Sequence, residues 1–326
     1  MGPAAQAALR QALVLCAGEG RRLRPLTQRV PKPLAPFLNL PMLRHSLRCL
    51  QRAGVQRVWL NAWHLADAIE AFAASDPEPG LELRVLREPE LLGTGGAIAN
   101  LAPQLHEGPL LVAAADILSD AKLGAFAQAH VESGADASML LTTRADPEQF
   151  GPVEIDTDGR LTDIVRTLGR PGERALVNAS YHLLERRVIE RFPRGPCCLV
   201  RQGYLPWMRD GLNCRGVLHE GAWAETGNAA ALLAAQRDAL SGALPVDPSL
   251  LAEGGVRRGA SALVHPQAQV APDAQLLDGT TVAEGCVIGA GARLHGCLLL
   301  PGTHVEAGRE LHDVLLGPHQ TVECPE

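Results

Sequence analysis

The sequence lacks the excess of positive charge that proteins use to attract nucleic acid. Lys and Arg total 30 against 36 for Asp and Glu, which gives a formal net charge of -6. Binding to nucleic acid or to anionic membranes draws on many positive side chains at once. Neither is therefore an expected partner, and any binding of phosphate groups must be local.

Long apolar runs and metal-spaced cysteines are also missing. No stretch approaches the roughly 20 apolar residues that cross a membrane, and the N-terminus lacks the charged, apolar and small-residue order of a signal peptide. We therefore expect a cytoplasmic protein. Several cysteines lie in apolar runs, where a reduced thiol packs as a small hydrophobic group. Structural roles are expected for all eight: Cys16, Cys49, Cys197, Cys198, Cys214, Cys286, Cys297 and Cys324.

Two familiar nucleotide motifs are absent from residues 13–34, LVLCAGEGRRLRPLTQRVPKPL. A dinucleotide-binding turn needs a third glycine where this chain has Leu23, and the glycine, lysine and hydroxyl run that ends a P-loop occurs nowhere. The segment has instead an apolar run typical of a buried parallel strand, followed by Gly18 and Gly20. Such a turn exposes backbone amides, which can bind phosphate oxygens.

Arg22 and Lys32 add a planar fork and a point charge to this segment, so that two phosphate groups can be stabilised separately. The segment resembles the signature of the sugar nucleotidyltransferases, roughly AGxGTRLxPLTxxxPKPL, with Arg21 in place of the family's threonine. The resemblance implies that Arg22 contacts the triphosphate and that Lys32 contacts the phosphates at the reacting centre. It also implies nucleotide contacts at Ala17, Gly18, Gly20 and Arg21.

Asp116 ends the apolar run LLVAAAD, at the edge of a sheet where open α/β folds place their ligands. Magnesium is usually held by one or two carboxylates together with substrate phosphates, so Asp116 is the first candidate for a Mg²⁺ ligand. The family has NGD here, whereas this chain has Ala114 and Ala115 before the aspartate. Glu225 stands where the family's WxDxGT segment has aspartate, and it is the second candidate, ranked lower because its longer side chain needs a backbone shift or a bridging water.

The segment LGTGGA at 92–97 resembles a family loop that packs against base and ribose. The resemblance implies contacts from Thr94, Gly95 and Gly96, with an ordinary turn as the alternative.

Two later segments, FGPV at 150–153 and VNAS at 177–180, resemble family segments that border the sugar. They imply contacts from Gly151 and Asn178. The family's EKP lysine, which grips the sugar phosphate, is missing from this region, where Arg166 or Arg170 could supply the charge.

Strand and helix patterns alternate from about residue 11 to 240, which predicts an α/β fold with a doubly wound, mostly parallel sheet. Apolar strand candidates lie at 58–62, 83–86, 110–116 and 137–143, and helical patterns at 65–73 and 121–132. Within the second helical pattern, four residues recur at nearly helical spacing and are expected in the core: Leu123, Phe126, Ala127 and Val131.

Residues 241–261 are rich in glycine and proline and predict a linker. Beyond it aliphatic residues recur every six positions, and the phase resumes after a short insertion: Val264, Val270, Leu276, Val282, Ile288, Leu294, then Leu299, Val305 and Leu311. This hexapeptide repeat predicts a short left-handed parallel β-helix of about three coils. Its exposed ends favour burial against the first domain or against another subunit, and we expect a homo-oligomer formed through this domain. The predicted domains are 10–240 and 262–326.

We predict that a sugar 1-phosphate attacks the α-phosphorus of a nucleoside triphosphate and releases pyrophosphate. The run PLAPFLNLPML and the repeat tail resemble mannose-1-phosphate guanylyltransferase-type members, which implies GTP and mannose 1-phosphate. Transfer from UTP or dTTP stays open, as does a regulatory paralogue that binds an NDP-sugar. A further alternative is an acyltransferase whose base is one histidine of the repeat region: His265, His295, His304, His312 or His319.

Overall fold

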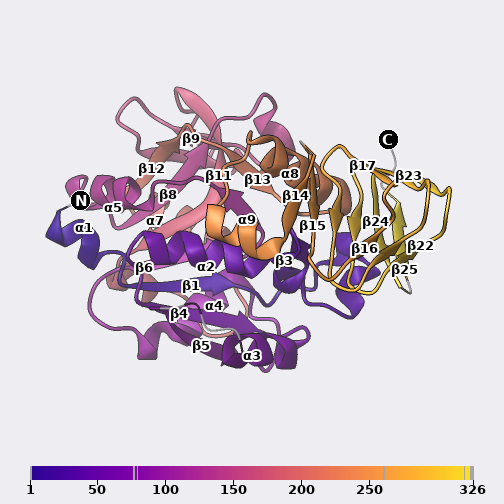
Figure 1. Cartoon of the computed structure of the whole chain (residues 1–326). Helices are drawn as coiled ribbons and strands as arrows, with labels where there is room; N and C mark the ends of the chain where they lie inside the picture. The colour runs from indigo at the N-terminus through magenta and orange to yellow at the C-terminus, as the bar shows by residue number, and fades with distance from the viewer. Residues whose placement is uncertain (1, 76–77, 79, 260, 319, 324–326) are drawn as a thin grey trace. The chain divides into compact units, whose positions relative to one another are not determined.

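A computed structural model describes residues 2–75, 78, 80–259, 261–318 and 320–323 (Figure 1). The chain forms two compact units that interleave along the sequence. Unit 1 comprises Met1–Gly18, Cys49–Ala115 and Ala121–Gly221, and unit 2 comprises Glu19–Arg48, Asp116–Asp120 and Ala222–Glu326. The predicted domains, 10–240 and 262–326, divide the chain differently and stay a prediction. Three residues discussed above lie outside the described residues: Ala260, in the predicted linker, His319 and Cys324.

Unit 1 is built on a nine-stranded sheet with the order β10-β9-β11-β6-β1-β4-β5, and β8 lies between β11 and β12. Parallel pairs join β1 to β4 and β6, β4 to β5, and β8 to β12, whereas β11 is antiparallel to β6, β8 and β9. The predicted doubly wound, mostly parallel sheet is confirmed. The strands are β1 (Gln11–Leu15), β4 (Arg57–Ala62), β5 (Glu82–Arg87), β6 (Leu110–Ala114), β8 (Ala137–Thr142), β9 (Val153–Ile155), β10 (Leu161–Ile164), β11 (Arg174–Leu184) and β12 (Cys214–His219).

The helices of unit 1 connect these strands, except for one that precedes β1. The predicted helical patterns at 65–73 and 121–132 appear as α3 (Ala66–Ser75) and α5 (Leu123–Glu132). The others are α1 (Pro3–Ala7), α4 (Gly93–Leu101), α6 (Arg186–Ile189) and α7 (Leu205–Arg209), with short turns of other helix types at Ala102–Gln104, Pro147–Phe150 and Leu199–Tyr204. Helix α2 (Met42–Arg52) contains the chain boundary between the units after Arg48.

The prediction of which α5 residues are buried is wrong at one position. Leu123, Phe126 and Ala127 are buried, but Val131 is 37% exposed. His130 takes the buried place instead, because its ring nitrogens have partners: Nδ1 lies 2.7 Å from Ser138 Oγ, and Nε2 lies 3.3 Å from a Glu185 carboxylate oxygen. A buried polar side chain is tolerated when it is hydrogen-bonded in this way.

Unit 2 gathers the signature segment, a two-stranded ribbon, two helices and the repeat region around shared apolar residues. The signature forms three short 3-10 turns, η1 (Arg21–Leu23), η2 (Leu26–Gln28) and η3 (Lys32–Leu34), followed by the hairpin β2 (Pro36–Phe37) and β3 (Leu40–Pro41). The ribbon pairs β7 (Ile117–Ser119) with β13 (Trp223–Glu225). Leu26, Phe37, Leu232, Leu263 and Leu298 are buried in one cluster, so the signature, α8 (Ala229–Ser241) and the repeat region share a core.

The repeat region forms a parallel β-helix with three faces (Figure 1, orange to yellow). One face stacks β15 (Ala262–Val264), β18 (Thr281–Val282), β21 (Leu298–Leu299) and β24 (Val314–Gly317), flanked by β14 (Val256–Arg258) and β25 (Gln320–Glu323). The second stacks β16 (Gln269–Val270), β19 (Val287–Ile288) and β22 (His304–Val305), and the third stacks β17 (Gln275–Leu277), β20 (Arg293–His295) and β23 (Glu310–His312). All nine predicted inward residues belong to its apolar cluster, with Val264, Val270 and Leu311 only partly buried.

The predicted insertion in the repeat is wrong, because the structure has a deletion there instead. Leu276 pairs with Leu294, eighteen residues later, whereas Leu294 pairs with Leu311, only seventeen residues later. One residue is therefore deleted from the second coil, near Gly296, whose φ of 62° lies in the left-handed region that glycine adopts most easily.

Residues 241–261, expected as a linker, contain regular structure. Helix α9 (Pro248–Gly254) begins behind Asp247, whose carboxylate accepts a hydrogen bond from the Ser249 amide, and β14 follows it. Arg44 of α2 donates two hydrogen bonds to Glu253, at 2.9 and 3.1 Å, so α9 is bonded to α2 within unit 2. Across the described residues, no helix is both long enough and apolar enough to cross a bilayer.

We predict that His182 makes the fold sensitive to acid. Burial lowers the pKa of His182 from 6.5 to about 3, so the unfolded chain takes up a proton that the folded chain excludes. Stability present above pH 6.5 should therefore fall as the pH drops towards 3, by about 1.4 kcal/mol per pH unit for this group. The measurement is urea unfolding at several pH values across this range, which gives the free energy of unfolding as a function of pH. His182→Phe should reduce the slope of that plot by the amount that corresponds to about one proton.

His45, whose pKa burial lowers to about 4, should keep part of the pH dependence in that variant. The matched control is His106→Gln at an exposed histidine, which should leave the slope unchanged. An unchanged slope for His182→Phe would refute the assignment.

Candidate functional site

Unit 2 brings Lys32 and Asp116 into contact. Lys32 begins η3 between Pro31 and Pro33, which restrict the backbone on both sides. Its Nζ forms an ion pair with Asp116 Oδ2, and the two side chains are only 13% and 25% exposed. Partial exclusion of water strengthens the attraction between such charges relative to an open surface. The two residues that the signature and the apolar run single out separately are therefore direct neighbours.

The ribbon of unit 2 places Glu225 next to Asp116 along the backbone. Ile117, which follows Asp116, is the register partner of Glu225 in the β7–β13 pair. The Asp116 carbonyl accepts hydrogen bonds from the amide and the hydroxyl of Thr226, at 3.0 and 2.9 Å. Both predicted metal ligands therefore occupy adjacent positions at one end of the ribbon. Asn228 ends the segment 223–228 and is the N-cap of α8, where its side chain accepts a hydrogen bond from the Ala231 amide at 2.8 Å.

Arg22 and Glu225 form a second pair of opposite charges in unit 2. Arg22 Nη2 lies 3.3 Å from Glu225 Oε1, and the arginine side chain is 65% exposed. Gly227 provides the space for this contact, because a Cβ there would lie 2.8 Å from Arg22 Nη2 and 2.9 Å from Glu225 Oε1. All three predicted catalytic residues and the second predicted metal ligand thus fall into two adjoining cation–carboxylate pairs.

The glycine turn of the signature packs against Lys32. Gly20 has a φ of 62°, and a Cβ on it would lie 2.9 Å from both Lys32 Cβ and Thr27 Cγ2. Any larger residue would therefore push the turn away from the lysine. Arg21, predicted to contact nucleotide, is exposed and pairs with Glu19, which raises the pKa of Arg21 through a hydrogen bond and its charge.

Unit 1 holds the start of the same turn through a buried polar relay that sequence reasoning missed. The Cys16 amide donates to Asn61 Oδ1 at 2.7 Å, and Asn61 Nδ2 donates to Glu88 Oε1 at 2.8 Å. Glu88 Oε2 then accepts from the Leu92 amide at 3.1 Å. The relay links the end of β1, next to Ala17 and Gly18, to the beginning of α4. Burial raises the pKa of Glu88, and the two donors oppose that effect.

The glycines predicted to contact base and ribose lie in the first turn of α4, where they face residues 195–199. The amides of Gly95 and Gly96 both donate to the Cys197 carbonyl, at 2.9 and 3.2 Å. A Cβ on Gly96 would lie 2.6 Å from the Gly195 carbonyl oxygen, so the contact requires glycine. Thr94 Oγ1 accepts from the Leu199 amide at 2.8 Å. These amides and this hydroxyl thus have protein partners, and nucleotide contact by these residues stays a prediction.

The predicted sugar-side residues also belong to unit 1. Asn178 Oδ1 accepts from the Ser180 amide at 2.8 Å, which leaves the Nδ2 hydrogens as its donors. Gly151 lies against Val165, whose φ of 51° is unusual for a β-branched residue. Arg166, the possible substitute for the family's lysine, pairs with Glu148 and also lies 3.4 Å from Glu154. Its charge is therefore balanced by two carboxylates.

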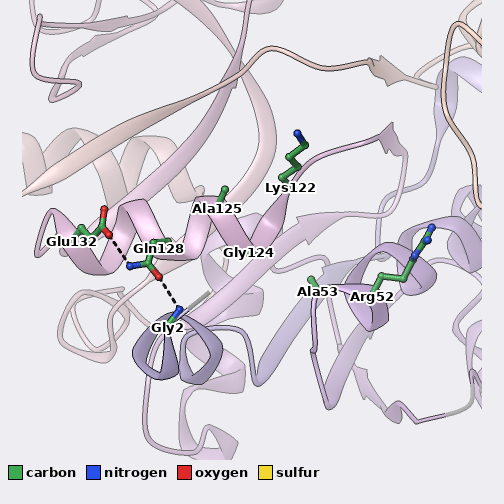
Figure 2. A pocket seen from close by; sticks show the side chains of 8 residues that line it. All are labelled: Gly2, Arg52, Ala53, Lys122, Gly124, Ala125, Gln128 and Glu132. Atoms are coloured by element: carbon green, nitrogen blue, oxygen red, sulfur yellow. Dashed lines mark hydrogen bonds between the residues drawn. The ribbon is translucent and has the colours of Figure 1, made fainter.

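Unit 1 also has a hollow that is lined by residues other than those predicted for the site. It lies along α5 and beside the residue that precedes α1, and Figure 2 shows its lining side chains. The Gly2 amide donates to Gln128 Oε1 at 3.2 Å, and Gln128 Nε2 donates to Glu132 Oε1 at 2.7 Å. None of the predicted site residues lines this hollow, so the hollow does not support the predicted substrate contacts of those residues.

Comparisons with known proteins identify relatives over most of the chain. A family model described as "Nucleotidyl transferase" matches residues 11–242. A mannose-1-phosphate guanylyltransferase of Mycobacterium tuberculosis is 34% identical over 298 residues, which cover 90% of this chain and 81% of the relative. A probable mannose-1-phosphate guanylyltransferase 1 of Oryza sativa subsp. japonica is 29% identical over 321 residues, covering 96% and 87% of the two chains.

Solved structures share the fold at lower identity. HddC from Yersinia pseudotuberculosis, complexed with GMP-PN, superposes with a TM-score of 0.59 at 22% identity and covers 68% of this chain and 96% of its own. A putative glucose-1-phosphate thymidylyltransferase from Bacillus anthracis gives a TM-score of 0.56 at 20% identity, covering 67% and 90%. Both similarities support the α/β architecture.

We predict that Asn61 stabilises unit 1 through the relay. Asn61→Ala removes the partner of the Cys16 amide and one donor to the buried Glu88 carboxylate, and it should lower the free energy of unfolding by about 2–3 kcal/mol. Denaturant unfolding measures this loss. Glu90→Gln, an exposed neighbour of the relay, should change stability by less than about 0.5 kcal/mol. A loss for Asn61→Ala as small as that of the control would contradict the relay's role.

Proposed function

We propose that this chain, which belongs to the nucleotidyl transferase family, condenses GTP with mannose 1-phosphate to give GDP-mannose and pyrophosphate. The names of its relatives from Mycobacterium tuberculosis and Oryza sativa, together with the length of chain that they share with it, support this choice of substrates. The observation within the structure that carries the proposal is the pairing of Lys32 with Asp116 beside Arg22 and Glu225.

The reaction joins two anionic molecules, so the site must lower their repulsion. A phosphate oxygen of mannose 1-phosphate attacks the α-phosphorus of GTP in line and forms a new P–O bond. The bond from the α-phosphorus to the bridging oxygen breaks, and pyrophosphate leaves with its electron pair. No covalent bond to the protein is required. Catalysis then rests on positioning and on charge stabilisation, as in phosphoryl transfer generally.

Lys32 and Arg22 supply the positive charge in this proposal. Lys32 is held close to Asp116 by short turns and prolines, so its ammonium group is positioned before substrates bind. Arg22 is more exposed and presents a planar fork suited to two phosphate oxygens of the leaving group. Both cations now contact carboxylate oxygens, and phosphate oxygens are acceptors of the same kind and charge. When substrates bind, phosphate oxygens can replace the carboxylate oxygens as partners of Lys32 and Arg22. Each cation then keeps a negatively charged partner before and after binding.

Asp116 and Glu225 suit Mg²⁺, because both offer hard carboxylate oxygens from adjacent backbone positions. These two residues would hold the ion, which supplies further neutralisation of phosphate charge when bound. Asp116 is tied to Thr226 through its backbone carbonyl and to Lys32 through Oδ2 of its carboxylate, so two contacts fix where this carboxylate lies.

We assign the remaining predicted contacts to the substrates. Ala17, Gly18, Gly20 and Arg21 would border the triphosphate, and Thr94, Gly95 and Gly96 the base and ribose. Because the amides of Gly95 and Gly96 bind Cys197, contact with the base would use the bare glycine backbone rather than these donors. Gly151 and the Nδ2 group of Asn178 would border the mannose.

The domain division and assembly are part of the same proposal. Residues 10–240 would carry the transferase and 262–326 the β-helix, with self-association through the β-helix, because the ends of a stacked array are exposed unless they are covered. We also propose a cytoplasmic location, because the seven described cysteines form no disulfides.

The test is pyrophosphate release from a panel of nucleoside triphosphates and sugar 1-phosphates. GTP with mannose 1-phosphate should give the highest kcat/KM. A preference for UTP or dTTP would overturn the base assignment alone. Binding of NDP-sugar without turnover of any pair would favour a regulatory paralogue and overturn the enzymatic proposal.

In the same assay, Lys32→Ala should lower kcat by about 10²-fold or more, because one preorganised charge donor is lost. Arg29→Ala provides a matched control, since Arg29 is an exposed cation of the same segment outside both ion pairs. Near-normal turnover by Lys32→Ala, or an equal loss in Arg29→Ala, would show that the site is assigned wrongly.

A further inference from the structure

Two histidines stack on the third face of the β-helix, and neither is among the residues assigned above. His295 ends β20 and His312 ends β23, and the two are register partners in a parallel pair. Their rings lie nearly parallel, at 15°, with centroids 4.5 Å apart. The shortened coil brings about this pairing, because it joins residues seventeen positions apart. The transferase chemistry uses neither ring.

Glu310 adds a carboxylate to the stacked rings. It lies two residues before His312 on β23, so the strand period places both on the same side of the sheet. Its Oε1 lies 3.2 Å from His312 Nε2. One ligand atom from each of His295, Glu310 and His312 lies within 4.8 Å of the others, and within the described ranges this is the only such group of three.

Asp278 prepares His295 for binding a metal. Its Oδ2 lies 3.1 Å from Nδ1 of His295, so the Nδ1–H group donates there and Nε2 keeps its lone pair. A carboxylate behind a ligating histidine is the usual support of a metal site, because it fixes the tautomer and the ring orientation. Asp313, the other carboxylate at this corner, pairs with Arg237 and is not part of the group.

We propose that His295, His312 and Glu310 form a zinc site on the β-helix, with water as the fourth ligand. Tetrahedral zinc, with ligands at about 2.0–2.2 Å, needs ligand atoms about 3.4 Å apart. Rotation of His312 and Glu310, which are 58% and 53% exposed, can close the remaining gap. Imidazole nitrogens favour zinc over magnesium.

Zinc binding would stabilise the stacking of the coils. The ligands come from two successive coils, so the ion would link the coil of β20 to the coil of β23. In a stacked array each coil is held mainly by its neighbours. An ion that binds only the folded array therefore raises its stability by mass action.

The test is calorimetric titration of the full chain with zinc chloride, after EDTA treatment and in excess Mg²⁺, which fills oxygen-donor sites. The wild-type chain should bind one zinc ion, and His312→Ala should lose at least 10-fold in zinc affinity. Asp278→Asn, which removes no ligand, should lose about 10–100-fold. Zinc should also raise the Tm of the wild-type chain but not that of His312→Ala.

The matched control is His304→Ala, which removes an exposed histidine of β22 outside the group. It should bind zinc like the wild-type chain. Absence of zinc binding, equal affinities in the wild-type chain and His312→Ala, or an equal loss in His304→Ala would overturn the proposal. Because the assay needs no nucleotide or sugar, its outcome is independent of the transferase activity.

Discussion

The contact between the Lys32 ammonium and the Asp116 carboxylate is the interaction on which the site depends. A lysine that is 13% exposed needs a partner, because an uncompensated charge with so little water around it is costly. Meeting that need fixes the path of the signature segment. Gly20 must lack a side chain so that the turn can lie against Lys32, and Gly227 must lack one so that Arg22 can reach Glu225. The glycines of both motifs are thus explained by charge pairing in unit 2.

The interleaved chain explains how residues so distant in sequence meet. Asp116 lies two residues after β6 and immediately before β7, and β7 pairs with β13, the strand that ends at Glu225. The signature segment then shares its apolar core with α8 and with Leu263 and Leu298 of the β-helix. The repeat region is therefore part of the packing that supports Lys32 and Arg22, as well as a stack of coils in its own right.

The sequence predicts the features that follow from periodicity. The strands of the parallel sheet and the inward aliphatic residues of the β-helix follow from the alternation and the six-residue spacing, because burial of apolar side chains fixes both. Periodicity fails where a polar contact decides the outcome. His130 is buried in place of Val131 because Ser138 and Glu185 offer it partners, and Asn61 and Glu88 are buried because they bind each other. These partners come together only in the folded chain.

The central claim is that Lys32 and Asp116 act as a unit, and a double-mutant cycle on kcat/KM tests it most directly. The variants are Lys32→Ala, Asp116→Asn and the two combined, assayed with GTP and mannose 1-phosphate. If the residues share one task, the combined variant should lose little more than the worse single variant, with a coupling of at least about 10-fold. Losses that simply multiply would show two independent residues and would contradict the account.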